Sequence, residues 1–201
     1  MVHRLCSWAA LIALWVAGLA GCAASPALDP AQQSELAAFP AGVGRGYPTA
    51  LLPTSGGSAL QPGSPAPDFV LQLEDGRYIR LSDLHGTPVV INFWATWCGP
   101  CRIEMPELMR SVAAEPNLLL LAVNLREPLT AVEPFAQSFE MVTPVVLDSE
   151  GKVADQFGVR GLPTTVFIDA EGRIQAIHAG IVTPPALADY LEKIVAAEEP
   201  L

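Results

Sequence analysis

The feature that most constrains this chain is a pair of cysteines that closely follows an apolar run. Val89–Trp94 is suited to one buried strand, and Cys98 and Cys101 stand a few residues beyond it in the order Cys-Gly-Pro-Cys. The residues after the pair predict a helix over about 98–114. Pro100 fits the first helical turn, where its missing N–H is not needed. The sequence therefore predicts a strand, a turn that carries two thiols, and a helix.

The position of the pair at the start of a helix indicates redox chemistry. The first N–H groups of a helix lack partners within it and the helix dipole is positive there, so a thiolate is stabilised and the pKa of such a thiol falls. We expect Cys98 to be the exposed nucleophile and Cys101, one turn on, to be the more buried resolving thiol. A structural zinc site commonly needs a second such pair. Covalent haem attachment needs His where this chain has Arg102.

The other two of the four cysteines, Cys6 and Cys22, lie in the N-terminal segment. The segment begins with a basic residue, continues with an uncharged apolar run over 5–20 and ends in Leu-Ala-Gly-Cys at 19–22. This order is typical of a secretory signal peptide. The Leu-Ala-Gly-Cys segment resembles a bacterial lipobox, in which the cysteine, here Cys22, is lipidated and becomes the mature N-terminus. The alternative is an uncleaved signal anchor. Both predict a membrane-anchored, extracytoplasmic domain in the bacterial cell envelope.

The chain divides into three predicted parts. Residues 1–21 are the lipoprotein-type signal peptide, 22–63 a linker rich in Ala, Pro, Gly and Ser, and 64–201 the folded domain. Such a linker cannot bury enough apolar surface to offset its conformational entropy, so we expect a flexible tether that carries the lipid anchor. The chain has 11 Lys and Arg against 21 Asp and Glu, which argues against nucleic acid as a partner.

Apolar patterning places strands and helices in alternation along the domain. A β-hairpin comes first, with alternating residues at 69–73 and 77–81 on either side of a Glu-Asp-Gly turn. The alternation that follows predicts an α/β fold, a three-layer sandwich whose central sheet is flanked by helices. Further strands are expected at 89–94, 118–123, 144–147, 164–168 and 174–179, and helices at 98–114, 130–139, 152–157 and 185–197.

Three separated motifs resemble one family. The segment WCGPC at 97–101 looks like the thioredoxin motif, and its extension over 92–106, NFWATWCGPCRIEMP, resembles the extracytoplasmic TlpA/ResA-type thiol-disulfide oxidoreductases. The segment GLPTT at 161–165 resembles the thioredoxin-fold loop that carries a cis-proline. The similarity covers about residues 64–197, which is nearly the whole predicted domain.

The resemblance implies a thioredoxin-like fold with a mixed sheet and an extra N-terminal β-hairpin. It also implies that Pro163 is cis and packs beside Cys98 as part of the catalytic site, so that the backbone of Leu162 can pair with an extended substrate. Trp97 would lie on the surface beside Cys98 and contribute to docking. The predicted substrate-binding residues are Trp97, Gly99, Pro100 and Leu162.

The resemblance also implies a direction of electron flow. It favours a monomeric reductase of protein disulfides, with apocytochrome c before haem attachment as the leading substrate class and a membrane dithiol as electron donor. We expect no cofactor other than the redox-active disulfide of Cys98 and Cys101, and no metal.

One departure from thioredoxin points to a proton carrier. Cytoplasmic thioredoxins have a buried Asp where this chain has Asn92, which cannot accept a proton. Glu104 stands three residues beyond Cys101 on the same helix face. A partly buried carboxylate there can have a raised pKa and exchange a proton with the thiol. The ResA-type motif has a functional Glu at this position; the alternative is an ordinary surface Glu.

Two other functions compete for the same cysteines. A copper-binding or copper-delivery module could use both sulfurs, because thiolates suit Cu(I), although no His or Met partner stands near the pair in sequence. A peroxiredoxin would need a P-x-x-x-T/S-x-x-C pattern, and Ile91 and Ala95 occupy those places. Thiol-disulfide exchange is therefore the favoured function.

Overall fold

The fold is organised around one sheet. The computed structural model describes residues 46–51, 60–74 and 76–195. The strands are β1 (Thr49–Leu51), β2 (Val70–Gln72), β3 (Tyr78–Arg80), β4 (Val89–Trp94), β5 (Leu119–Leu125), β6 (Val145–Asp148), β7 (Thr164–Ile168) and β8 (Ile174–Ala179). The helices are the 3-10 helix η1 (Leu81–Leu84), α2 (Gly99–Ala113), α3 (Leu129–Ser138), α4 (Lys152–Gln156) and α5 (Pro184–Val195).

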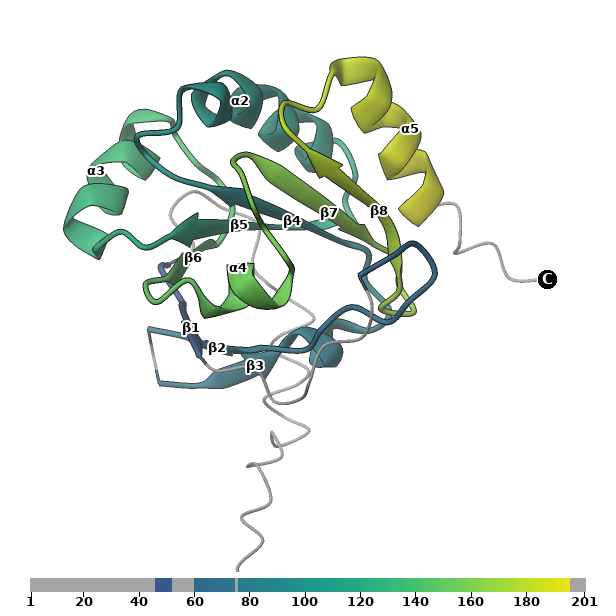
Figure 1. Ribbon diagram of the computed structural model, residues 1–201, viewed down its shortest axis with the longest axis horizontal. Coiled ribbons are helices and arrows are strands. Elements are labelled where there is room, and N and C mark those ends of the chain that lie inside the picture. The colour runs from purple at the N-terminus through teal and green to yellow at the C-terminus, as the bar shows by residue number, and fades with distance from the viewer. Residues whose placement is uncertain (1–45, 52–59, 75, 196–201) are drawn as a thin grey trace, which may run out of the picture.

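The sheet is mixed, with the strand order β3-β2-β1-β6-β5-β4-β7-β8 (Figure 1). β4, β5 and β6 run parallel to one another, whereas β7 is antiparallel to β4 and β8 to β7. The parallel strands require crossover connections, which α2 and α3 supply. β4 is an interior strand of the sheet and leads into α2. The cysteine pair therefore lies at the carboxyl end of a central strand.

Helices cover both faces of the sheet (Figure 1). α2, α3 and α5 pack on one face, and α4 lies on the other. Side chains of β4 alternate between them: Ile91 and Phe93 pack in the cluster with α4, whereas Val90 and Trp94 pack toward α2. Since both faces are buried, every residue of β4 is buried, which explains the unbroken apolar run.

The predicted three-layer α/β fold is confirmed. The predicted hairpin corresponds to β2 and β3, which pair antiparallel. The observed ends of the helices and strands differ from the predicted ends by one or two residues. Helix and strand ends are generally uncertain by that amount.

The linker prediction is wrong for one short segment. β1 lies within 22–63 and pairs antiparallel with β2 and parallel with β6, so it joins the hairpin to the main sheet. Its three residues are too few to show an alternating pattern, and prolines stand close on both sides at 48 and 53. Its neighbours stabilise it, for example through the hydrogen bond from Leu147 N to Pro48 O (2.8 Å). The folded domain therefore includes residues before Ser64.

The predictions for the signal peptide at 1–21 and for lipidation of Cys22 lie outside the described residues. So does most of the predicted linker, at 22–45 and 52–59. Among the described helices, none combines the length and apolar character needed to cross a membrane.

Candidate active site

The two cysteines of the motif form a disulfide at the N-terminus of α2. Their Cα atoms are 5.3 Å apart. Cys98 is the N-cap residue of the helix, and its Sγ accepts a hydrogen bond from the backbone N–H of Cys101 (3.2 Å). Pro100 lies in the first turn, as expected. An N–H that already points at Sγ in the oxidised form is placed to stabilise a thiolate there after reduction.

Both cysteines are buried, as expected for Cys101 but not for Cys98. The expected exposure of Cys98 is wrong, because it is only 4% exposed and Cys101 is 2% exposed. Both pack in a cluster with Trp94 and Met105, and the half-buried Leu162 closes over it. Both cysteines are therefore buried, and Cys98 lies in the wall of a surface groove.

That groove is open at the surface and has Cys98 in its wall. It is lined by residues 97–100 from the turn and the start of α2, by residues 125 and 126 after β5, and by residues 159–162 before β7. We call it the disulfide groove. All four predicted substrate-binding residues line it, which brings together two motifs that are more than 50 residues apart in the sequence. Trp97 is 72% exposed at its rim, as predicted.

The loop before β7 adopts the conformation that the resemblance implied. The Leu162–Pro163 peptide bond is cis, and the Pro163 carbonyl accepts a hydrogen bond from Gly180 N (2.8 Å). Leu162 lies in the wall of the disulfide groove. A chain lying in the groove would therefore meet both Cys98 and this loop.

Glu104 is a buried residue, not a surface one. It is 3% exposed and shares the buried face of α2 with Cys101. Its Oε2 accepts a hydrogen bond from Val182 N (2.6 Å), and its Oε1 accepts one from Asn92 Nδ2 (2.8 Å). Thr165 Oγ1 adds a longer contact to Oε1 (3.5 Å). The carboxyl thus ties α2 to β4, to β7 and to the loop before α5.

Burial raises the pKa of Glu104 above its ordinary value. The hydrogen bonds from Val182 and Asn92, and the charge of His178, lower that pKa but do not offset the loss of solvation. A carboxyl with a raised pKa stays protonated at a pH at which a surface Glu is already ionised. The site therefore contains a buried carboxyl with a raised pKa one helical turn from Cys101.

A second buried carboxylate was missed by the sequence analysis. Glu127, 9% exposed, accepts hydrogen bonds from Thr96 N (2.7 Å), Thr96 Oγ1 (2.5 Å) and Asn124 Nδ2 (2.8 Å). Thr96 stands two residues before Cys98, so Glu127 holds the turn that carries the nucleophile. The signal was present: Asn124 and Glu127 are polar residues at the carboxyl end of a buried parallel strand, where functional groups gather in α/β sheets.

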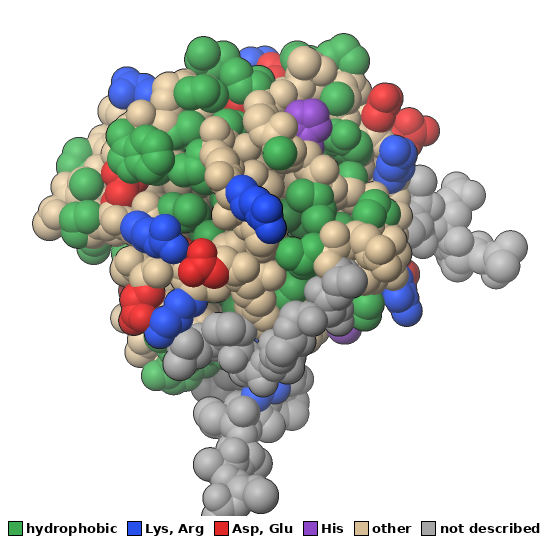
Figure 2. Space-filling model, viewed as in Figure 1, with side chains coloured by type: hydrophobic (Ala, Val, Ile, Leu, Met, Phe, Trp, Pro, Cys, Tyr) green, Lys and Arg blue, Asp and Glu red, His purple; other side chains and the backbone are tan. Residues whose placement is uncertain are grey.

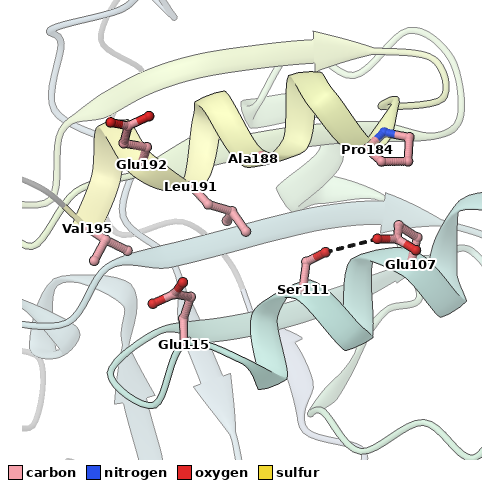
Figure 3. Close-up of a pocket in the computed structure, with 8 residues that line it drawn as sticks. All are labelled: Glu107, Ser111, Glu115, Pro184, Ala188, Leu191, Glu192 and Val195. Carbon is pink, nitrogen blue, oxygen red and sulfur yellow. Dashed lines mark hydrogen bonds between the residues drawn. The ribbon is translucent and has the colours of Figure 1, made fainter.

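A second groove lies between α2 and α5 (Figure 3). Its lining includes Glu107, Glu115 and Glu192, and no cysteine. Glu107 forms an ion pair with Arg110 (2.6 Å) and accepts a hydrogen bond from Ser111 (3.3 Å). In the part of the chain that the structure describes, no three His, Cys, Asp or Glu side chains are grouped as metal ligands. This groove offers no redox group, and the disulfide groove is the candidate active site.

Comparison with known proteins supports this assignment. A family model described as the AhpC/TSA family matches residues 62–177. The chain is 41% identical over 139 residues to thiol-disulfide oxidoreductase ResA of Geobacillus thermodenitrificans, an alignment that covers 68% of this chain and 80% of the relative.

Solved structures agree with this result. A Chlorobium tepidum protein assigned as a thiol:disulfide interchange protein DsbE superposes with a TM-score of 0.60 at 33% identity, covering 69% of this chain and 98% of that one. The exposed lipoprotein thioredoxin Etrx1 of Streptococcus pneumoniae superposes with a TM-score of 0.51 at 30% identity, covering 63% of this chain and 98% of that one. The predicted thioredoxin-like fold is confirmed.

Proposed function

Because the chain belongs to the AhpC/TSA family and is a ResA-like thiol-disulfide oxidoreductase, we propose that it reduces disulfides of partner proteins outside the cytoplasm. The observation that carries the proposal is the disulfide at the N-terminus of α2, whose Cys98 lines a groove shared with the cis-proline loop. Such a groove suits an extended polypeptide better than a small molecule, because the backbone at Leu162 can pair with a strand.

The proposed reaction exchanges one disulfide for another. In the reduced protein, the Cys98 thiolate attacks one sulfur of the partner's disulfide, and the partner's second sulfur leaves as a thiolate that takes up a proton. The Cys101 thiol then loses its proton and its sulfur attacks Cys98 Sγ. This attack breaks the mixed disulfide and expels the partner's first sulfur as a thiolate, which takes up a proton from solvent, so two electrons have passed to the partner. The partner is released with two thiols, and the chain keeps the Cys98–Cys101 disulfide seen in the structure.

Two further steps complete the cycle. We assign to Glu104 the proton that Cys101 releases, because it is the buried carboxyl on the same helix face and its pKa is raised. A membrane dithiol then reduces the disulfide again, and the cycle needs no other cofactor.

The proposed setting is the cell envelope. We propose that residues 1–21 are a signal peptide, that Cys22 carries a lipid, and that the mature protein is a monomer. The similarity to an exposed lipoprotein thioredoxin supports the anchor. Apocytochrome c before haem attachment is the proposed substrate class, because a c-type haem site requires two reduced cysteines in C-x-x-C-H.

Trapping of the mixed disulfide tests the proposal. A Cys101→Ser variant lacks the resolving thiol, so we expect it to accumulate covalent adducts with envelope proteins that disappear on reduction. A Cys98→Ser, Cys101→Ser double variant is the control and should give none. Mass spectrometry of the adducts identifies the partner. If Cys101→Ser yields no more adducts than the double variant, the proposal is wrong.

The copper-module alternative predicts a different result. It requires Cu(I) bound to the two sulfurs of the purified, reduced protein. We expect metal analysis of that sample to find no stoichiometric copper; a ratio near one copper per chain would favour the alternative.

A further inference from the structure

The disulfide groove differs in charge from the chain as a whole. The sequence has a formal net charge of −10, yet the charged side chains that line this groove are Arg126 and Arg160, and no carboxylate lines it. Apolar parts of Trp97 and Leu162 share the lining. In the second groove, between α2 and α5, the charged residues of the lining are glutamates. The positive charge beside the redox pair is therefore local.

The two arginines enter the groove from different segments. Arg126 follows β5, and Arg160 lies between α4 and the cis-proline loop. The segment between α4 and β7 crosses the face turned to the viewer in Figure 1, and on that face Figure 2 shows basic, acidic and hydrophobic side chains close together. A polypeptide that pairs with the loop would therefore lie in a groove whose walls include both arginines and Cys98.

Both guanidinium groups remain available to a ligand. Arg126 contacts Asp155 (3.2 Å), but their side chains are 59% and 67% exposed, and an ion pair this exposed is weak. The Arg126 side chain also lies against Gly151, where any Cβ would clash with it. Arg160 is exposed and has no ion-pair partner within the described part of the chain.

We propose that the disulfide groove selects polypeptide segments in which an acidic side chain stands within two residues of the target cysteine. This deepens the proposed function and rests on it. Successive residues of an extended strand are about 3.3 Å apart, so such a carboxylate stays within about 7 Å of the reacting sulfur along the strand. A carboxylate that close would repel the Cys98 thiolate, and the arginines remove that repulsion while they bind it.

The proposal narrows the substrate class. A c-type haem site has His after its second cysteine, which carries no negative charge. The acidic residue must then occupy one of the two positions between the cysteines, precede the first of them, or follow the His. The chemistry of the exchange is unchanged, with two electrons passing from the dithiol to the partner's disulfide.

A matched peptide pair tests the selection. Two synthetic peptides with the same internal disulfide differ only in Glu or Gln before the first cysteine, and the reduced full-length protein is mixed with each at low ionic strength. We expect the Glu peptide to be reduced about three- to tenfold faster, and the ratio to fall toward one in high salt. Arg160→Gln should lower the ratio. Arg110→Gln, a change on the exposed side of α2, should leave it as in the wild type.

The outcomes separate this inference from the proposed function. Equal rates for both peptides in the wild type overturn the acidic preference and leave the reductase intact. A preference that survives in an Arg126→Gln, Arg160→Gln double variant also overturns it, because the arginines would then not be its cause. If neither peptide is reduced, both the reductase and the preference are wrong.

Discussion

Two buried carboxylates, Glu104 and Glu127, lie near the redox pair, and they accept hydrogen bonds from different parts of the structure. Glu104 accepts hydrogen bonds from an Asn side chain on β4 and from a backbone N–H before α5, so its partners belong to the packed interior. Glu127 accepts two of its three from Thr96, in the turn that leads to Cys98. Burial alone therefore does not define the role of a carboxylate. The pKa of Glu104 is raised by burial, and its place beside Cys101 suits proton transfer; the contacts of Glu127 suit positioning.

The largest effect should come from removing the positioning carboxylate. Glu127→Ala removes the acceptor of the buried Asn124 Nδ2 and of the part-buried Thr96 N and Oγ1, and an unsatisfied buried donor costs about 1–3 kcal/mol. We expect the free energy of unfolding to fall by about 3 kcal/mol, measured by urea denaturation of the oxidised protein. Glu133→Ala, an exposed position on α3, is the control and should change it by less than about 0.5 kcal/mol. Equal values for the two variants would show that Glu127 does not hold the turn.

The second effect concerns the rate of exchange. If Glu104 takes the proton from Cys101, Glu104→Gln should slow disulfide reduction about tenfold, less than the largest general-base effects because thiols also exchange protons with water. It should also change the shape of the pH profile. Glu127→Gln serves as the comparison: it can lower the rate, but it should leave the shape of the profile unchanged. Superimposable profiles for the wild type and Glu104→Gln would remove the proposed difference between the two carboxylates.

The sequence was most informative where function depends on neighbours along the chain. Cys98, Cys101 and Glu104 follow one another on one helix, so spacing alone placed them on α2 and placed Glu104 on the same face as Cys101. The strand before them was clear because both faces of β4 are buried and its apolar run is unbroken.

Contacts between segments distant in the sequence were either implied only by the family resemblance, as for the loop at 161–165, or missed, as for Glu127. Glu127 reaches Thr96 only because β4 and β5 are adjacent in the sheet, with Trp94 paired to Asn124. The burial of Cys98 depends on Leu162, and the charge of the groove on Arg160, both from the loop before β7. A single sequence shows no such pairings.

The smallest effect is the pH dependence of stability, and its sign separates Glu104 from an ordinary surface carboxylate. Its ordinary pKa is 4.5 and its pKa in the folded protein is higher. Between these two values the folded chain binds more of this proton than the unfolded chain. The contribution of Glu104 to stability is therefore fully present below about pH 4.5 and is lost as the pH rises through the folded pKa, with a slope of at most about 1.4 kcal/mol per pH unit for one proton.

Urea denaturation over a pH series measures this contribution as the wild-type free energy of unfolding minus that of Glu104→Gln. We expect the difference to decrease as the pH rises from about 4.5, because Gln does not ionise. Thr165→Val is the control, since it removes a contact to the carboxyl but keeps the titrating group, and it should retain the wild-type decrease. A difference that increases with pH would mean that the folded protein stabilises the ionised form of Glu104. The carboxyl would then be a structural hydrogen-bond acceptor, and Cys101 would need another route for its proton.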